Sequence, residues 1–119
     1  MVLNMTVKEK IIKYSLMRCK YDRVSESTAK HNYAMTSLIK LLHKIKKENI
    51  DTSFYLELLK YEDDRVMITA AGHCLSLGIY IDEAKKTLYN LSKSAETPLL
   101  RFSAGSLLEK YEEQGYLNL

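Results

Sequence analysis

Residues 63–78 read DDRVMITAAGHCLSLG, and this stretch predicts one α-helix with both of its ends marked. Asp63 or Asp64 can cap the N-terminus by accepting backbone N–H groups that have no partner within the helix. Gly78 follows the expected end, where a residue of left-handed conformation is normally required. Between these ends, apolar residues recur at helical spacing and define an inward face: Val66, Ala70, Cys74 and Leu77. The stretch therefore favours a helical protein.

The same pattern returns in a helix that we expect to begin at Thr97 and Pro98 and to end at Gly115. Proline is tolerated at the first helical position because its missing N–H needs no partner there. Three inward positions of the two stretches correspond, each pair 34 residues apart (100 − 66, 104 − 70, 108 − 74): Leu100 with Val66, Ala104 with Ala70, and Leu108 with Cys74. A period of about 30–50 residues built from a helix pair is typical of a solenoid array.

Four further helices are expected around these two. A capping box of Thr6 and Glu9 begins the first helix, which should end near Tyr21 with Ile12, Leu16 and Cys19 inward. The second begins within residues 25–28 and has this inward face: Ala34, Leu38, Leu41, Leu42 and Ile45. A short third helix follows the possible caps at residues 51–53 and carries Phe54, Tyr55, Leu58 and Leu59, and a fifth is capped by Asp82.

The stretch from Asp63 to Gly78 resembles the second helix of a HEAT repeat, which has an acidic cap, a Val-Arg pair, an alanine four residues after the valine, and a closing glycine. Leu100-Arg101 carries the arginine of that pattern, whereas Met67 departs from it in the first copy. The resemblance implies an all-α fold of about six antiparallel helices in a HEAT-like α-solenoid. We expect one domain over residues 1–119, with two N-terminal helices in 6–48 and the repeat region in 52–115.

Charge is unevenly distributed along the chain. Residues 1–50 carry eleven Lys and Arg against four Asp and Glu, and residues 51–119 carry seven against eleven, so that +7 and −4 sum to the net charge of +3. Such asymmetry can mark a face that binds a partner. No signal peptide and no apolar run long enough to span a membrane is visible, which favours a cytoplasmic protein without membrane contact.

The sequence offers little for catalysis. His31, His43 and His73 lie too far apart for a metal-ligand pair, and no phosphate-binding glycine loop is present. His73 and Cys74 are adjacent, but neighbouring residues on a helix point about 100° apart and do not face each other. We therefore expect no enzyme, no metal and no cofactor.

An acidic edge is the strongest candidate for a binding site. If the helices alternate up and down, the links after the first, third and fifth helices share one edge and gather these residues: Tyr21, Asp22, Tyr61, Glu62, Asp63, Asp64 and Glu96. Carboxylates beside exposed tyrosines suit the capture of a basic protein. The alternative is structural, since acidic residues near helix N-termini also complement the helix dipole.

A basic stripe lies opposite the inward face of the second helix and consists of Tyr33, Ser37, Lys40, Lys44 and Lys47. Such a stripe can contact phosphates, which would suit a nucleic-acid-binding helical repeat. The alternative is the solvated face of an amphipathic helix.

The whole chain resembles small bacterial HEAT-like domains of unknown function, some of which are immunity proteins of contact-dependent or polymorphic toxin systems. That resemblance implies a protein that binds and occludes a cognate toxin domain, for which a basic nuclease would suit the acidic edge. Nucleic-acid binding and a general adaptor role are the alternatives, and the oligomeric state stays open.

Overall fold

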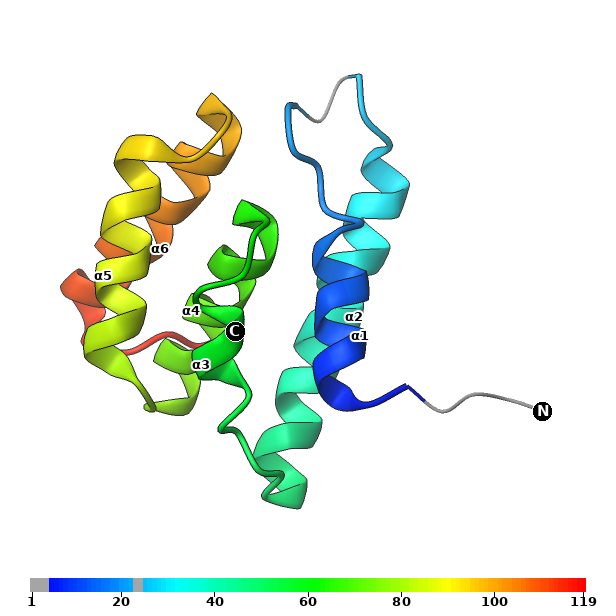
Figure 1. Ribbon diagram of the computed structural model, residues 1–119, viewed down its shortest axis with the longest axis vertical. Coiled ribbons are helices and arrows are strands. Elements are labelled where there is room, and N and C mark those ends of the chain that lie inside the picture. Colours follow the sequence, from blue (N-terminus) through cyan, green and yellow to red (C-terminus); the bar gives the residue numbers. More distant parts are fainter. Residues whose placement is uncertain (1–4, 23–24) are drawn as a thin grey trace.

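The computed structural model describes residues 5–22 and 25–119, and within these ranges the chain forms six helices and no strand (Figure 1). The helices are α1 (Val7–Ser15), α2 (Thr28–Glu48), α3 (Tyr55–Leu58), α4 (Asp64–Leu77), α5 (Ile81–Ser94) and α6 (Pro98–Gln114). The prediction of an all-α fold is confirmed. Residues 1–4, part of the N-terminal stretch without a signal-peptide pattern, and residues 23–24 lie outside the described ranges.

Side-chain caps begin α1, α4 and α6 where the sequence predicts them. The caps predicted for the third helix at residues 51–53 are wrong, because Phe54 is the N-cap residue of α3 and makes no side-chain cap bond. Thr6 and Glu9 form the capping box of α1, and the Asp63 carboxylate accepts the Arg65 N–H at the start of α4. The Thr97 hydroxyl accepts the N–H of Leu100 at the start of α6, where Pro98 occupies the first turn. Gly78 and Gly115 end α4 and α6 with φ of 73° and 79°. These caps confirm the predicted boundaries of α4 and α6.

The end predicted for the first helix is wrong. α1 ends at Ser15 instead of near Tyr21, and Ile11 and Ser15 are its buried residues, whereas Leu16 is 39% exposed. After Leu16, the N–H groups of Met17 and Arg18 donate to carbonyls three residues back, and the N–H of Cys19 donates to His31 Nδ1 at 2.9 Å. The Glu26 carboxylate then accepts the backbone N–H groups of Lys20, Tyr21 and Asp22 at 2.8, 2.6 and 3.1 Å. Backbone donors that are bonded to a side chain cannot continue the helical hydrogen-bond ladder.

The cap predicted for the fifth helix is also wrong. Tyr80 is the N-cap residue of α5, with a left-handed φ of 47° and no side-chain cap bond, and Asp82 lies inside the first turn. The first bond of the helix runs from the Ala84 N–H to the Tyr80 carbonyl at 2.9 Å. An aspartate within the first turn still stabilises the positive end of the helix dipole.

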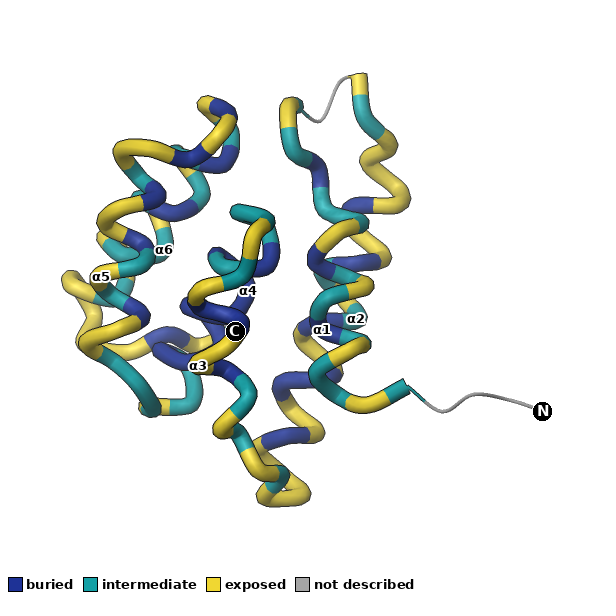
Figure 2. Tube along the Cα trace, viewed as in Figure 1, coloured by how far each residue is buried: buried dark blue, intermediate teal, exposed yellow. Residues whose placement is uncertain are grey.

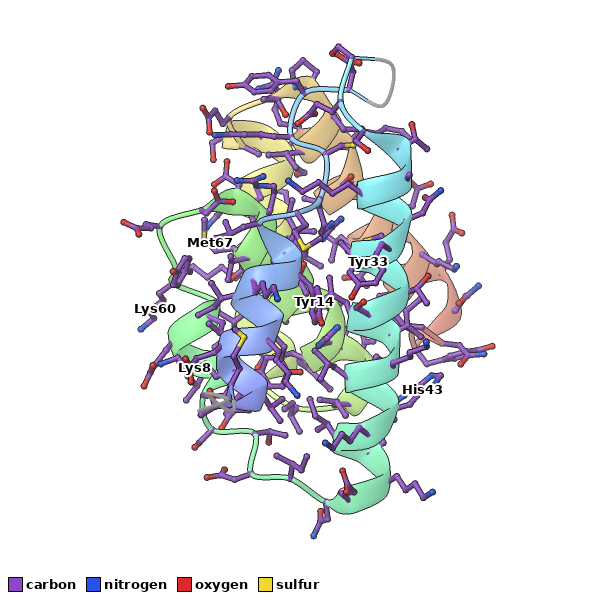
Figure 3. All side chains as sticks on the ribbon, turned by 90° about the vertical axis from the view of Figure 1, so that its right-hand side faces the viewer. Lys8, Tyr14, Tyr33, His43, Lys60 and Met67 are labelled. Carbon is purple, nitrogen blue, oxygen red and sulfur yellow. The ribbon has the colours of Figure 1, made fainter. Side chains whose placement is uncertain are left out.

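α1 and α2 pack against each other. Tyr14 and Tyr33 meet edge to face, with ring centroids 5.9 Å apart and planes at 73° (Figure 3). This geometry brings the positive edge of one ring to the negative face of the other. The long helix α2 buries the inward face that its sequence predicts, from Ala34 to Ile45.

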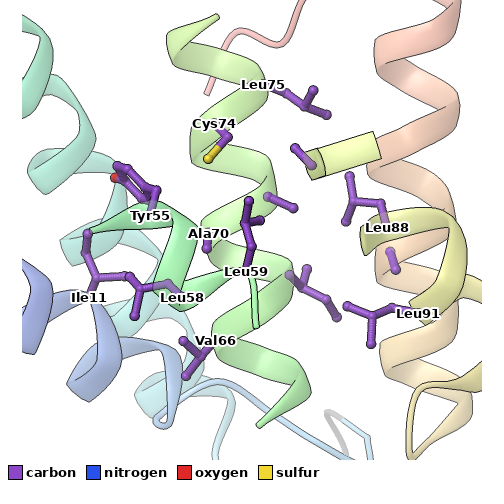
Figure 4. Close-up of a cluster of buried hydrophobic side chains, with 14 of the residues drawn as sticks. Ile11, Tyr55, Leu58, Leu59, Val66, Ala70, Cys74, Leu75, Leu88 and Leu91 are labelled. Carbon is purple, nitrogen blue, oxygen red and sulfur yellow. The ribbon is translucent and has the colours of Figure 1, made fainter. Parts of the chain in front are cut away.

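The centre of the core is α4, in which nearly every residue from Val66 to Leu75 is buried (Figure 2). Ile11 of α1 and the α3 residues Tyr55 and Leu58 lie on one side of this helix, and Leu88 and Leu91 of α5 lie on the other (Figure 4). A helix that is enclosed on all sides must be apolar on every face, or its polar side chains must form hydrogen bonds within the protein. Each fully buried leucine stabilises the fold by about 1.5–3 kcal/mol relative to an exposed one.

Gly72 lies within α4 and Gly78 follows its last residue, and the backbones of these two glycines have different conformations. A Cβ atom on Gly72 would lie 3.5 Å from Leu107 Cδ1 and 3.7 Å from Leu119 Cδ1, both ordinary contacts, and the backbone there is helical. A Cβ atom on Gly78 would meet nothing within 4 Å, but φ is 73°. Both positions have room for an alanine side chain, but only Gly72 has a backbone conformation that alanine adopts without strain.

We therefore expect Gly72→Ala to raise the free energy of unfolding by about 0.5–1 kcal/mol, because alanine is the better helix former. Gly78→Ala should lower it by about 1–2 kcal/mol, because a left-handed conformation strains a residue with a Cβ atom. Urea denaturation of the two variants measures both effects. Changes of the same sign in both would contradict this interpretation.

Candidate functional site

The chain segments of the predicted acidic edge lie together in the structure. The Thr97 hydroxyl donates to the Lys20 carbonyl, which joins the α5–α6 link to the α1–α2 link. The Lys20 Nζ atom lies 2.7 Å from a Glu96 carboxylate oxygen. The Glu96 N–H donates to Asp64 Oδ2 at 2.7 Å, which adds the start of α4. Two of these three contacts join residues that lie more than 70 positions apart in the sequence.

Arg65 holds the same region from the α4 side. Its guanidinium donates to the Leu16 carbonyl at 2.8 Å and to the Arg18 carbonyl at 3.2 Å. It also donates to both carboxylate oxygens of Asp63, at 3.1 and 3.0 Å. Burial opposes ionisation of Asp63, but the hydrogen bonds and charge of Arg65 outweigh it and hold the pKa of this carboxyl below its ordinary value.

The predicted edge residues therefore differ in what they can offer a partner. Asp63 and Glu96 are paired with cations, Asp64 accepts a backbone bond, and Asp22 accepts the Ser25 N–H and hydroxyl, each at 2.6 Å. Tyr61 is half-buried against the core, whereas Glu62 is exposed. Tyr21 is 60% exposed, with the Lys20 ammonium 5.8 Å from its ring centroid. Two of the five carboxylates of this edge are thus paired with cations, and two others accept hydrogen bonds from neutral groups.

A groove between α2, α4 and α6 is a second candidate, and the sequence analysis missed it. Its volume is about 280 Å³, and its lining is mostly apolar: Met35, Leu38 and Ile39 of α2, Ile68 and Gly72 of α4, and Phe102 and Leu107 of α6. Phe102 lies at this groove with 73% of its surface exposed. The only sequence signal for it is an aromatic residue outside the inward face of the last helix, beside the small residues Ser103 and Ser106.

The charge on the side chains that line this groove is positive. Of the described residues that line it, only Arg18 carries a permanent charge, and none is a carboxylate. The Arg18 guanidinium donates to the Thr69 hydroxyl at 2.8 Å, near the acidic edge. Lys46 donates to the Ser76 hydroxyl at 3.0 Å, two turns further along α4. Cations thus lie along α4 towards both of its ends.

His73 lies at the base of the groove and is buried. Its Nδ1 atom is hydrogen-bonded to the Tyr55 hydroxyl, with 2.7 Å between the two atoms. Burial, together with the nearby charges of Arg18 and Lys46, lowers the pKa of His73 to about 3. Burial also raises the pKa of the adjacent Cys74 thiol to about 12, with a smaller contribution from Glu83. The ring is therefore neutral and the thiol protonated at neutral pH.

The predicted basic stripe borders a separate hollow of about 230 Å³ between α1 and α2. Lys40, Lys44 and Ser37 of the stripe line this hollow together with Lys10 and Tyr14 of α1. Lys44 also pairs with Glu48 at 3.9 Å. The participation of Lys10 was not predicted, because it depends on how the two helices pack.

No protein family, no characterised protein and no solved structure matches this chain. Within residues 5–22 and 25–119, no group of three His, Cys, Asp or Glu side chains is arranged to hold a metal ion. None of the helices in these ranges combines the length and apolar character that crossing a membrane requires.

Substitution of Arg65 by lysine tests its role at the edge. Lysine keeps the charge but cannot present a planar fork to a carboxylate and two carbonyls together. We expect Arg65→Lys to lower the free energy of unfolding by about 1.5–3 kcal/mol, the range for hydrogen bonds that involve a charged group. Arg101→Lys is the matched control, because Arg101 donates to the single carbonyl of Ala95 and should cost less. Urea midpoints measure both, and equal losses would contradict this role.

The buried His73 makes stability depend on pH. Its pKa is about 3 when folded against 6.5 when unfolded, so its contribution is complete above pH 6.5 and is lost as pH falls toward 3. Between pH 7.5 and pH 5 we expect a loss of about 2 kcal/mol, because each unit below the unfolded pKa costs about 1.36 kcal/mol.

His73→Gln should flatten this slope, since glutamine does not titrate, whereas His43→Gln at an exposed position should keep it. Urea denaturation at the two pH values measures the effect. An unchanged slope in His73→Gln would show that other groups cause it.

Proposed function

We propose that this chain is a protein-binding domain of the immunity type, which occludes a cognate toxin domain, and that the α2–α4–α6 groove is its main contact surface. The observation that carries the proposal is Phe102, exposed at 73% beside a mostly apolar groove. Exposed apolar patches on a folded domain mark interaction sites. Aromatic side chains that fill a partner's pocket dominate binding energy at protein interfaces.

A HEAT-like arrangement of the six described helices is part of this proposal. In such an array, α2, α4 and α6 would be the inner helices of successive helix pairs, and the groove between them would be the concave surface. Solenoid proteins use this surface to bind other proteins. The toxin as partner rests on the resemblance of the sequence, and fold alone does not assign it.

The acidic edge is a second contact in this proposal, and it would meet a basic region of the toxin, such as the active site of a nuclease. Tyr21, Glu62 and Glu96 are its exposed members, and Glu96 is paired with Lys20. Substituting Asp63 or Asp64 would also remove hydrogen bonds within the fold. Glu62→Gln is therefore the cleaner test of the edge, because it removes an exposed charge.

Nucleic-acid binding is the second candidate, and the hollow bordered by Lys10, Lys40 and Lys44 is the observation that favours it. Lysines that converge on a concave surface can neutralise phosphates. A general adaptor role would use the same groove as a toxin and differs only in the identity of the partner.

Phe102→Asp tests the groove, because a carboxylate there must be desolvated when a partner binds. We expect at least about a tenfold loss of affinity, as for a central aromatic contact. The matched control is Tyr89→Asp, at an aromatic residue of α5 that is 57% exposed and does not line the groove. Affinity capture from the native cell, with the partner identified by mass spectrometry, supplies the partner for titration.

The outcomes separate the candidates. A stoichiometric partner with a toxin domain, lost with Phe102→Asp and kept with Tyr89→Asp, would support the proposal, and growth rescue by co-expression would confirm neutralisation. Recovery of nucleic acid with steeply salt-dependent affinity would favour the lysine hollow instead. A housekeeping protein as the partner would favour the adaptor role.

A further inference from the structure

The C-terminal segment, residues 116–119, lies across the molecule next to the groove. Gly115 ends α6 with φ of 79°, and the chain then runs without regular secondary structure toward α4 (Figure 1). Its side chains alternate, since Leu117 is 3% exposed, Asn118 is exposed, and Leu119 lines the groove. This alternation is that of an extended chain with one face against an apolar surface.

Leu119 occupies one end of the groove. Its Cδ1 atom lies 3.7 Å from the position that a Cβ atom on Gly72 would take, an ordinary contact distance, so its side chain packs over Gly72. The Leu119 carbonyl lies 3.1 Å from His43 Nε2 on α2. The segment therefore leaves α6, passes Gly72 of α4 and reaches α2.

The rest of the groove stays open beside this segment and continues the same apolar surface. Met35 and Ile39 of α2 and Phe102 of α6 line it. Leu119 thus shows directly which kind of side chain the groove accepts. Arg18, which lines the groove, would repel a basic residue placed next to such a side chain, since no carboxylate side chain lines the groove to offset it.

We propose that the groove recognises a short extended protein segment that places a leucine where Leu119 lies and has no basic residue beside it, and that residues 116–119 compete with this segment for one end of the site. This inference rests on the proposed protein-binding function and names the chemistry of the recognised segment. Binding then requires displacement of Leu119, so the observed affinity is the intrinsic affinity reduced by the fraction of molecules with an open groove.

The test uses a fluorescein-labelled peptide that copies residues 114–119, Gln-Gly-Tyr-Leu-Asn-Leu, with an amidated C-terminus. Fluorescence polarisation measures its binding to the chain and to Leu119→Ser, in which the competing side chain is gone. We expect Leu119→Ser to bind the peptide about tenfold more tightly than the unchanged chain does. A peptide with both leucines replaced by serine should not bind.

Controls distinguish this effect from loosening of the fold. Leu56→Ser, at an exposed leucine of α3 outside the groove, should leave binding unchanged. His43→Ala removes the contact to the Leu119 carbonyl and keeps the core, so it should tighten binding in the same direction by a smaller factor. If Leu119→Ser fails to fold, His43→Ala carries the test alone.

Equal binding to all variants, or no binding to Leu119→Ser and His43→Ala, would overturn the inference. The proposed function can fail separately. Partner capture that is lost with Phe102→Asp but unaffected by excess peptide would keep the function and reject the leucine segment. If the peptide binds but Phe102→Asp captures the partner as well as the unchanged chain does, the groove does not bind the partner, and that part of the proposed function is rejected.

Discussion

Helix α4 is enclosed almost completely from Val66 to Leu75, and this enclosure constrains the helices around it. Ala70 and Ala71, two of its buried residues, carry small side chains that let neighbouring helices approach closely. Its polar groups must find partners away from water, since an unpaired buried polar group costs about 1–3 kcal/mol. The Arg18 bond to Thr69 and the Tyr55 bond to His73 supply those partners from the α1–α2 link and from α3.

Charged residues at the start of α4 form hydrogen bonds to the α1–α2 link and to the α5–α6 link. Arg65 and Asp63 form a pair whose hydrogen bonds also hold the carbonyls of the α1–α2 link, and Asp64 holds the start of the α5–α6 link. These charges are therefore engaged within the fold. A partner that approaches this edge meets a region of mixed charge with an exposed tyrosine, and the apolar groove begins beside it at Arg18.

Local rules predicted most of the fold and little of the groove. Caps at Thr6, Asp63 and Thr97 follow from hydrogen bonds over three residues, so the sequence alone reveals them. The end of α1 depends on side chains that follow it, His31 at the Cys19 N–H and Glu26 at the N–H groups of residues 20–22, and helical periodicity does not reveal these bonds. The groove joins side chains from Met35 to Leu119, so only the packing of three helices creates it. The gathering of the edge segments was foreseen, but their internal pairing was not.

Cys19 and Cys74 are both buried and neither is in a disulfide, yet they lie in different environments. Cys19 lies in the α1–α2 link, where its N–H donates to His31 Nδ1 at 2.9 Å, and Cys74 lies in the central helix. Alkylating reagents reach a buried thiol only when the surrounding structure opens. The rates at which the two cysteines are modified would therefore measure the opening of the edge and the opening of the core as separate events, without any added label.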